Sequence, residues 1–432
     1  MRRKLSGLSD CQWGATSGCS YEKKFKNTKV VINFTFPTNH RNFAKLALLA
    51  ELLENASAKY HSEMLVSRKL SEMYGASYGV SVLRYGNQHT LQVKMTYPND
   101  RYLPGDQDLT TQVFSFLEEM IENPLANEGQ FDAAYFKIHQ TNMINYLDSI
   151  VDNKEYYATL QLQRLYYPND PDHGAFLLGD VASFKQITPK QLYTYYLTIL
   201  KTAEITILVG GDVAIDKIQT ELSRFRSFGD RQPAKYELKV IPAPVSQVAT
   251  GEQTLVGSQS ILSMGYQLPI YFGDQDYFAA MIFNQLFGGS SQSLLFTNVR
   301  EKESLAYDIH SNYNSLFGMV TVQAGIDQKN EKQVSQMVPQ QLNKIVAGDY
   351  DDQLLAGIKQ ALINQHRSEG DHLAALIDKQ YLQQIMGFSI ADTEWESQVN
   401  SVNRTAISAV AKRLQLRAVF TLNSEEGTNG VD

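Results

Sequence analysis

The stretch NHRNFAKLALLAELLENASAKYHSEMLVSRKLSEMYGASYG, residues 39–79, decides how the first half of the chain folds. Small and large apolar residues recur in it at helical spacing, at Phe43, Leu46, Ala47, Ala50 and Leu53. This periodicity predicts a helix over 39–55, with Thr38 or Asn39 as its N-cap. The preceding residues 28–37, TKVVINFTFP, are rich in β-branched and aromatic side chains, so they are expected to form a strand.

The same order of elements recurs in the second half of the chain. A strand-like SILSMGYQLP (260–269) and a helix-like DYFAAMIFNQLFGG (276–289) repeat the opening pattern. An offset of 229 residues then aligns the segment around Tyr78 with the segment around Tyr307. The ends of the two halves also match, since VNRTAISAVAKRLQLRAVFTL mirrors ITPKQLYTYYLTILKTAEITILV. Similarity at both ends of each half indicates an internal duplication.

The segment between the halves, FGDRQPAKYELKVIPAPVSQ, contains three prolines and is expected to be extended, because proline restricts φ and removes a backbone donor. We therefore expect an N-terminal domain at 1–229, a linker at 230–250 and a C-terminal domain at 251–432. Strands mixed with pairs of helices predict the α+β class: two duplicated halves, each a mostly antiparallel sheet with helices packed on one face.

The composition narrows the classes of function. The chain has 432 residues, of which 43% are hydrophobic and 20% charged, and its net charge is −7. An acidic balance argues against nucleic-acid binding. The apolar runs are too short to cross a membrane, and no apolar run of signal-peptide type follows the basic start. Cys11 and Cys19 match no zinc or redox motif, and two free thiols in a reducing cytosol are favoured over a disulfide. These features predict a cytoplasmic protein with no membrane partner.

A second stretch, GGSSQSLLFTNVREKESLAYDIHS at 288–311, carries an arginine and a tyrosine seven residues apart. Together with residues 39–79 it resembles the insulinase (pitrilysin) family of metallopeptidases. The resemblance implies a clamshell half, with an inverted zinc motif H-x-x-E-H on the first helix. When ENASAKY is laid on the family's Gly-Thr-x-x-Tyr stretch, the five motif positions fall on residues 47–51, ALLAE.

Both histidines and the catalytic glutamate of that motif are absent. The two histidine positions hold Ala47 and Glu51, and the position of the general base holds Ala50. A methyl group cannot bind metal, and a catalytic zinc needs three protein ligands. The expected later helix, 136–146, has no acidic residue to complete a ligand set, although it contains His139. None of the eight histidines forms H-x-x-E-H or H-E-x-x-H. We therefore predict no catalytic residue, metal or cofactor on this chain.

The second-half motif keeps its two polar residues, Arg300 and Tyr307. The resemblance implies that the arginine anchors carbonyl groups of a peptide substrate and that the tyrosine hydroxyl supports the oxyanion. Both roles suit the residues, because guanidinium offers five donors in a fixed fork and a phenol can donate to developing negative charge. Without the resemblance, the two residues would be interpreted as a surface helix residue paired with Glu303 and a half-buried strand residue.

Substrate-binding residues without a metal site indicate a non-catalytic subunit of a zinc peptidase heterodimer, whose partner carries H-x-x-E-H. KKFKNTKVVINF and LSEMYGASYGVSV resemble a bacterial subgroup associated with 5-aminopentanol modification of elongation factor P. Three alternatives stay open: a structural or peptide-binding scaffold with no role in catalysis, a self-sufficient hydrolase with an unrecognised metal site, and a homodimer that binds peptides without cutting them.

Overall fold

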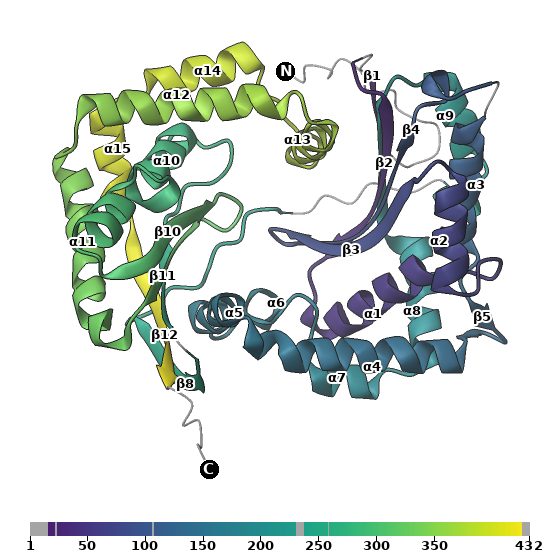
Figure 1. The fold of residues 1–432 in the computed structure, drawn as a ribbon, viewed down its shortest axis with the longest axis horizontal. Coiled ribbons are helices and arrows are strands. Elements are labelled where there is room, and N and C mark those ends of the chain that lie inside the picture. The colour runs from purple at the N-terminus through teal and green to yellow at the C-terminus, as the bar shows by residue number, and fades with distance from the viewer. Residues whose placement is uncertain (1–15, 22–23, 106–107, 230–236, 258, 426–432) are drawn as a thin grey trace. The chain divides into compact units, whose positions relative to one another are not determined.

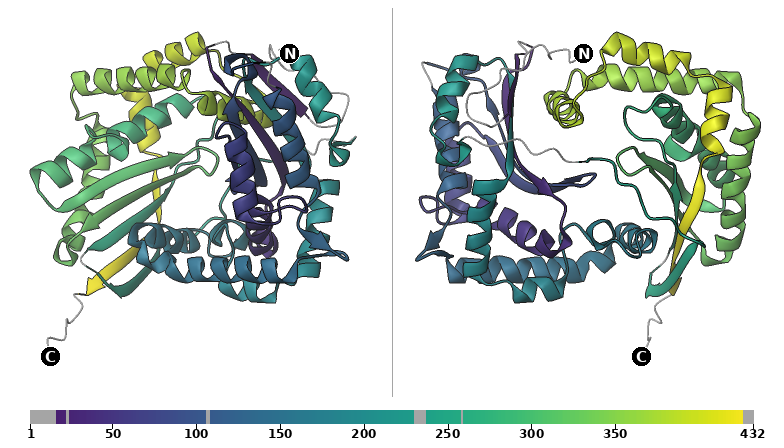
Figure 2. Two further views of the ribbon diagram at one scale, coloured as in Figure 1. Left: turned by 45° about the vertical axis from the view of Figure 1, so that its right-hand side comes forward. Right: turned by 180° about the vertical axis from the view of Figure 1, so that it is seen from behind.

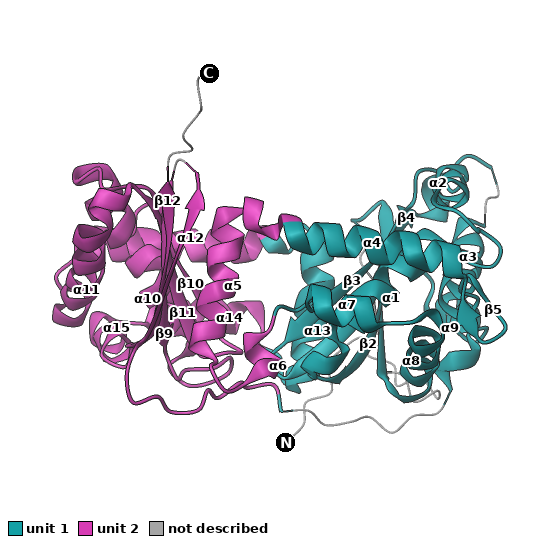
Figure 3. Ribbon diagram, turned by 90° about the horizontal axis from the view of Figure 1, so that it is seen from below, with its two compact units in different colours: residues 1–148, 176–237, 369–389 teal, residues 149–175, 238–368, 390–432 magenta. Residues whose placement is uncertain are grey.

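The computed structural model describes residues 16–21, 24–105, 108–229, 237–257 and 259–425, with the backbone alone for 16–21. It contains two compact units (Figure 3). Unit 1 comprises Met1–Asp148, Phe176–Glu237 and Glu369–Ser389. Unit 2 comprises Ser149–Ala175, Leu238–Ser368 and Ile390–Asp432. Each unit therefore contains one segment from the other half of the sequence.

Unit 1 is built on a five-stranded sheet with the order β1-β7-β2-β4-β3 (Figure 1). Its strands are β1 (Thr16–Tyr21), β2 (Asn27–Pro37), β3 (Ser77–Tyr85), β4 (Gln88–Pro98) and β7 (Glu204–Gly211). All neighbours are antiparallel except β1 and β7, which run parallel. A short hairpin of β5 (Ala126–Asn127) and β6 (Gln130–Phe131) stands apart from this sheet.

One face of this sheet is covered by helices that carry the main core of the unit. They are α1 (Phe43–Asn55), α3 (Leu109–Glu122), α4 (Ala133–Ser149), α7 (Val181–Gln186), α8 (Pro189–Thr202) and α9 (Ile215–Leu222), with α2 (Glu63–Glu72) beside them. Nine of the thirteen residues of α1 are buried, so this helix is apolar on nearly every side. At the start of α8, Thr188 and Gln191 form a reciprocal capping box, and Pro189 between them begins the helix.

The opposite face of the unit 1 sheet is covered by α13 (Leu373–Met386), a helix from the second half of the sequence (Figure 1 and Figure 2). Its Ile377 and Tyr381 pack on Val31 and Leu208 of the two central strands. The Tyr381 hydroxyl also lies 3.1 Å from the Thr35 hydroxyl, inside the buried contact. This face of the sheet is therefore completed by a segment that lies far away in the chain.

Unit 2 repeats the plan with a sheet ordered β10-β11-β9-β12-β8. Its strands are β8 (Ala249–Val256), β9 (Ser260–Gln267), β10 (Ala306–Asn314), β11 (Met319–Ile326) and β12 (Gln415–Glu425). Only β8 and β12 are parallel. When the strands are matched in chain order, this order is the same as that of unit 1.

Helices again cover both faces of the unit 2 sheet. The main core involves α10 (Tyr277–Asn284), α11 (Glu331–Ala347), α12 (Asp352–Glu369), α14 (Asp392–Ser401) and α15 (Arg404–Ala411). The other face is covered by α5 (Lys154–Tyr166), from the first half of the sequence, which is followed by α6 (Pro171–Gly174). Ala158, Leu162 and Tyr166 of α5 are buried against β9 and β12.

The α+β class is confirmed, with one difference in detail at the first helix. The first helix was expected from residue 39, but a 3-10 turn at His40–Asn42 comes first and α1 begins at Phe43. Asn39 caps that turn by accepting a hydrogen bond from the Arg41 amide, as its side chain suggested. His366 and His372, six residues apart, lie on separate elements, because α12 ends at Glu369 and His372 is the N-cap of α13.

Part of the expected linker, residues 230–236, lies outside the described residues, as do Cys11 and the side chain of Cys19. Residues 237–248 contain no helix or strand. Among the helices that the structure describes, none combines the length and the apolar character needed to span a bilayer.

The close packing of α5 depends on a glycine of β9. A Cβ added at Gly265 would lie 2.9 Å from Cδ2 of Tyr166, whose ring is fully buried. We expect Gly265→Ala to lower the free energy of unfolding by about 1–3 kcal/mol, because a buried ring cannot move aside. Gly251→Ala is the matched control, since its Cβ approaches the flexible end of Leu165 at 2.9 Å and comes no nearer than 3.4 Å to the Phe420 ring. Equal losses in urea denaturation of the two variants would contradict this account.

A buried histidine in β4 predicts how stability depends on pH. His89 is 1% exposed beside the ring of Phe43, and burial, with a smaller effect from Arg84, lowers its pKa to about 3. The unfolded imidazole takes up a proton near pH 6.5, so between pH 6.5 and 3 the unfolded state binds more protons. The free energy of unfolding should therefore fall by about 1.4 kcal/mol per pH unit in this window. Urea titrations at pH 7, 6, 5 and 4 should show a shallower fall for His89→Gln, and parallel curves would rule the effect out.

Candidate functional site

Residues 47–51, the expected positions of the degenerate zinc motif, lie in the middle of α1, in unit 1. Ala47 and Ala50 are 3% and 6% exposed, so their methyl groups are part of the core. The side chain of Glu51 remains 41% exposed. The helix that would present metal ligands therefore presents two methyl groups and one carboxylate.

The carboxylate of Glu51 has a partner on the later helix α4. Nδ1 of His139 lies 3.6 Å from Oε2 of Glu51, and the imidazole side chain is only 12% exposed. The Tyr135 ring packs edge-on against this imidazole, with 4.4 Å between the ring centroids. The sequence predicted that His139 lies on this later helix, but nothing in the sequence indicated that its side chain would approach Glu51.

Two tyrosines bind the carbonyl groups at the end of α1. The hydroxyl of Tyr135 donates to the Leu52 carbonyl at 3.1 Å, and the hydroxyl of Tyr78 donates to the Leu53 carbonyl at 3.0 Å. The last carbonyls of a helix have no partner within it, so these bonds complete its C-terminus. Burial raises the pKa of both tyrosines, which keeps the hydroxyls protonated as donors.

The surroundings of this helix end are acidic. Glu54 accepts a hydrogen bond from the Val80 amide at 3.2 Å. Burial raises the pKa of Glu54, and the nearby carboxylates of Glu51 and Glu63 raise it further. The local field therefore opposes additional negative charge beside α1.

Zinc does not fit the residues present at this position. A catalytic zinc needs three protein ligands at about 2.0–2.2 Å from nitrogen or oxygen donors. Glu51 and His139 supply two donors, and Ala47 supplies none. Within the described part of the chain, no group of three or more histidine, cysteine, aspartate or glutamate side chains is placed to hold a metal ion.

Arg300 belongs to unit 2 and lies on a π-helical turn, η6 (Phe296–Lys302). Its guanidinium stacks over the Phe296 ring, 4.5 Å from the ring centroid. Arg300 is exposed. Among the described residues, neither Glu303 nor any other acidic side chain forms an ion pair with it. A guanidinium held on an aromatic face keeps its donors available for a ligand.

Tyr307 follows on β10, an edge strand of the unit 2 sheet. It is 57% exposed, and its hydroxyl donates to Oδ1 of Asp327 at 2.7 Å. This bond raises the pKa of Tyr307 and lowers the pKa of Asp327. Lys329 lies 3.4 Å from the other oxygen of Asp327. Tyr307 lies on a strand, as expected, but it is more exposed than a half-buried residue. Its hydroxyl proton is hydrogen-bonded to the Asp327 carboxylate.

The backbone between these two residues is strained. Ser304 has a φ of +53°, a left-handed conformation that is unusual for a residue other than glycine. Such outliers cost about 1–3 kcal/mol and concentrate at functional sites, as π-helical turns do. The sequence contained no signal for either feature.

Comparisons with known proteins agree with this picture. Residues 186–362 match the family model described as "Peptidase M16 inactive domain". The chain is 27% identical over 430 residues to the "Probable inactive metalloprotease YmfF" of Bacillus subtilis (strain 168), covering 98% of this chain and 99% of that protein.

Solved structures show the same fold over the whole chain. A conserved protein from Enterococcus faecalis V583 is 33% identical, with a TM-score of 0.92 and coverage of 98% of this chain and 100% of that one. The crystal structure of a peptidase M16 inactive domain from Pseudomonas fluorescens shares the fold at 16% identity, with a TM-score of 0.79 and coverage of 98% and 99%. The sequence and the fold of the chain are therefore similar to those of inactive homologues of the M16 (insulinase) family of metallopeptidases.

Proposed function

We propose that this chain is the non-catalytic subunit of a zinc peptidase heterodimer. In this proposal the partner carries the H-x-x-E-H helix and supplies zinc, the attacking water and the general base. The present chain supplies Arg300, Tyr307 and part of the chamber wall. The observation that carries the proposal is the contrast between the two motifs: the metal-binding positions hold buried methyl groups, whereas Arg300 and Tyr307 are both exposed.

The contacts of Tyr307 support a role as a hydrogen-bond donor to substrate. With a raised pKa, the phenol stays protonated at neutral pH. A peptide carbonyl that gains negative charge competes with Asp327 for this proton, and electrostatic stabilisation of this kind is a large term in peptide hydrolysis. Lys329 forms an ion pair with Asp327, so this carboxylate keeps a partner when the Tyr307 hydroxyl donates to the substrate instead.

Arg300 suits the anchoring of peptide carbonyl groups. Its guanidinium is exposed and held flat against Phe296, which reduces the conformational freedom lost on binding. The open edges of β3 and β10 provide rows of backbone groups to which an extended peptide can add as a further strand.

Association with 5-aminopentanol modification of elongation factor P is a finer proposal, supported by the resemblance alone. The scaffold and the peptide-binding homodimer remain the alternatives, and the experiment below separates them from the heterodimer.

The test is peptide cleavage by the chain co-expressed with a similar-length M16 protein that contains H-x-x-E-H. We expect Tyr307→Phe to lower kcat about 10²-fold, because one oxyanion donor is lost. Arg300→Gln should mainly raise KM, because it removes a substrate contact. Lys332→Gln, an exposed change on α11, is the matched control.

Size-exclusion chromatography of each variant with the partner shows whether the heterodimer forms. Unchanged cleavage by an intact heterodimer that carries the double variant Arg300→Gln/Tyr307→Phe would favour the scaffold. A chain that self-associates and ignores the partner would favour the homodimer.

Zinc binding by the chain alone is a second test. After incubation with zinc and desalting, we expect far less than one zinc per chain by atomic absorption, because only Glu51 and His139 offer donors at the former motif. The H-x-x-E-H partner, treated in the same way, is the positive control. Stoichiometric zinc on this chain would support the self-sufficient hydrolase instead.

A further inference from the structure

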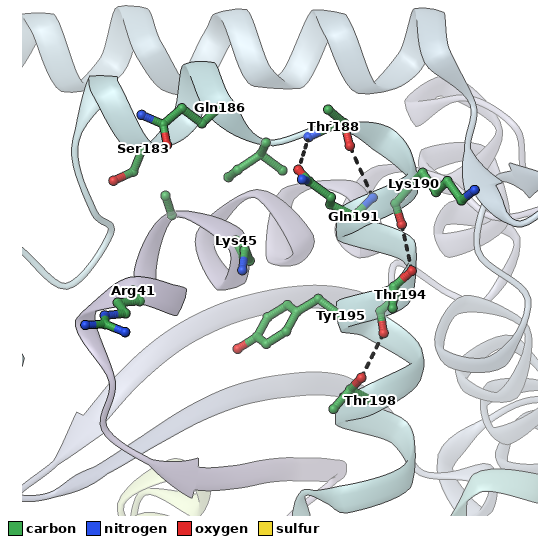
Figure 4. Close-up of a pocket in the computed structure, with 12 residues that line it drawn as sticks. Arg41, Lys45, Ser183, Gln186, Thr188, Lys190, Gln191, Thr194, Tyr195 and Thr198 are labelled. Carbon is green, nitrogen blue, oxygen red and sulfur yellow. Dashed lines mark hydrogen bonds between the residues drawn. The ribbon is translucent and has the colours of Figure 1, made fainter.

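Unit 1 contains a pocket between the start of α1 and the helices α7 and α8, and residues 47–51 do not line it (Figure 4). Its volume is about 690 Å³, and it is lined by side chains from 41–45, 183–191 and 194–198. Ligand pockets in proteins commonly measure about 300–1,000 Å³. The space is therefore large enough for a small organic molecule and much larger than one inorganic ion needs.

The charged residues that line this pocket are all basic. They are Arg41, Lys45 and Lys190, and no lining residue is acidic. None of the three forms an ion pair with a described residue, whereas Lys217 in the same unit is held by two aspartates. Unpaired like charges around one cavity repel each other, and an anion that binds there relieves that repulsion. This group of basic residues contrasts with the chain as a whole, whose net charge is −7.

The side chains converge at the end of the pocket nearest α1. Figure 4 shows Lys45 and Tyr195 extending into the space, Arg41 at its rim and Lys190 pointing away. Nζ of Lys45 lies 5.6 Å from the centroid of the Tyr195 ring. Burial raises the pKa of Tyr195, so its hydroxyl remains protonated and is a donor at neutral pH. One end of the pocket thus holds an ammonium, a phenol and a guanidinium.

The remaining polar groups leave this end electropositive. Asp180, the N-cap of α7, accepts hydrogen bonds from the amide and the hydroxyl of Ser183, at 2.8 and 3.1 Å, and does not line the pocket. The hydroxyls of Thr194 and Thr198 donate to carbonyls of their own helix. Apolar contact for the rest of a ligand is available from Ala44 and Ile187, which also line the space.

We propose that this pocket binds a small organic anion, with a phosphate or carboxylate group held by Lys45, Arg41 and the Tyr195 hydroxyl. Both groups accept charge-assisted hydrogen bonds from such donors. The site is separate from Arg300 and Tyr307, which belong to unit 2, so this inference does not depend on the proposed peptidase function.

The test is isothermal titration calorimetry of the full chain with two anions, pyrophosphate and citrate, and with neutral glucose. We expect saturable binding of at least one anion at one site per chain and none of glucose. Pyrophosphate and citrate distinguish a phosphate from a carboxylate ligand. Lys45→Gln should weaken binding about tenfold or more, and Tyr195→Phe by a smaller factor, because it removes a neutral donor.

Lys201→Gln is the matched control, since Lys201 lies in the last turn of α8 and does not line the pocket. Thermal melts of each variant show whether it is folded. If Lys45→Gln melts early, Arg41→Gln replaces it, because Arg41 is a second basic residue of the pocket and its position is exposed. The proposal fails if neither anion binds at millimolar concentration. It also fails if Lys201→Gln weakens binding as much as the pocket variants do, because the attraction would then be a general property of the surface.

Discussion

Each sheet of this protein needs a helix from the other half of the chain to cover its second face. In unit 1 this helix is α13, which brings Ile377 and Tyr381 onto the central strands. In unit 2 it is α5, whose Tyr166 approaches the strand closely enough that only glycine fits opposite its ring. A bare apolar sheet face is unstable in water, so neither five-stranded sheet is complete within its own half of the sequence. The positions of the other elements depend on this exchange.

Local patterns predicted individual elements at the start of each half. The expected strands at 28–37 and 260–269 are β2 and β9, and the expected helices at 39–55 and 276–289 contain α1 and α10, because residue type and periodicity among sequence neighbours determine such elements. The exchange of α5 and α13 did not follow, because amphipathic periodicity shows that a helix has a buried face but not which sheet buries it. The π-helical turn that carries Arg300 and the left-handed Ser304 were missed for a related reason: tertiary packing imposes both.

The candidate site was predictable by chemistry more than by geometry. The sequence alone shows that Ala47 and Ala50 cannot bind metal, since no conformation gives a methyl group a lone pair. The approach of His139 to Glu51 and the bond between Tyr307 and Asp327 depend on side chains brought together from separate elements. The sequence motifs therefore proposed the candidate residues, whereas the contacts of those residues could be found only from the fold.

The reciprocal exchange of α5 and α13 also bears on how the duplicated sequence arose. The two helices occupy equivalent places in the repeated order, each following the long helix α4 or α12. Each half contains one such helix and places it on the sheet of the other half, so the arrangement within this one chain matches that of a domain-swapped dimer.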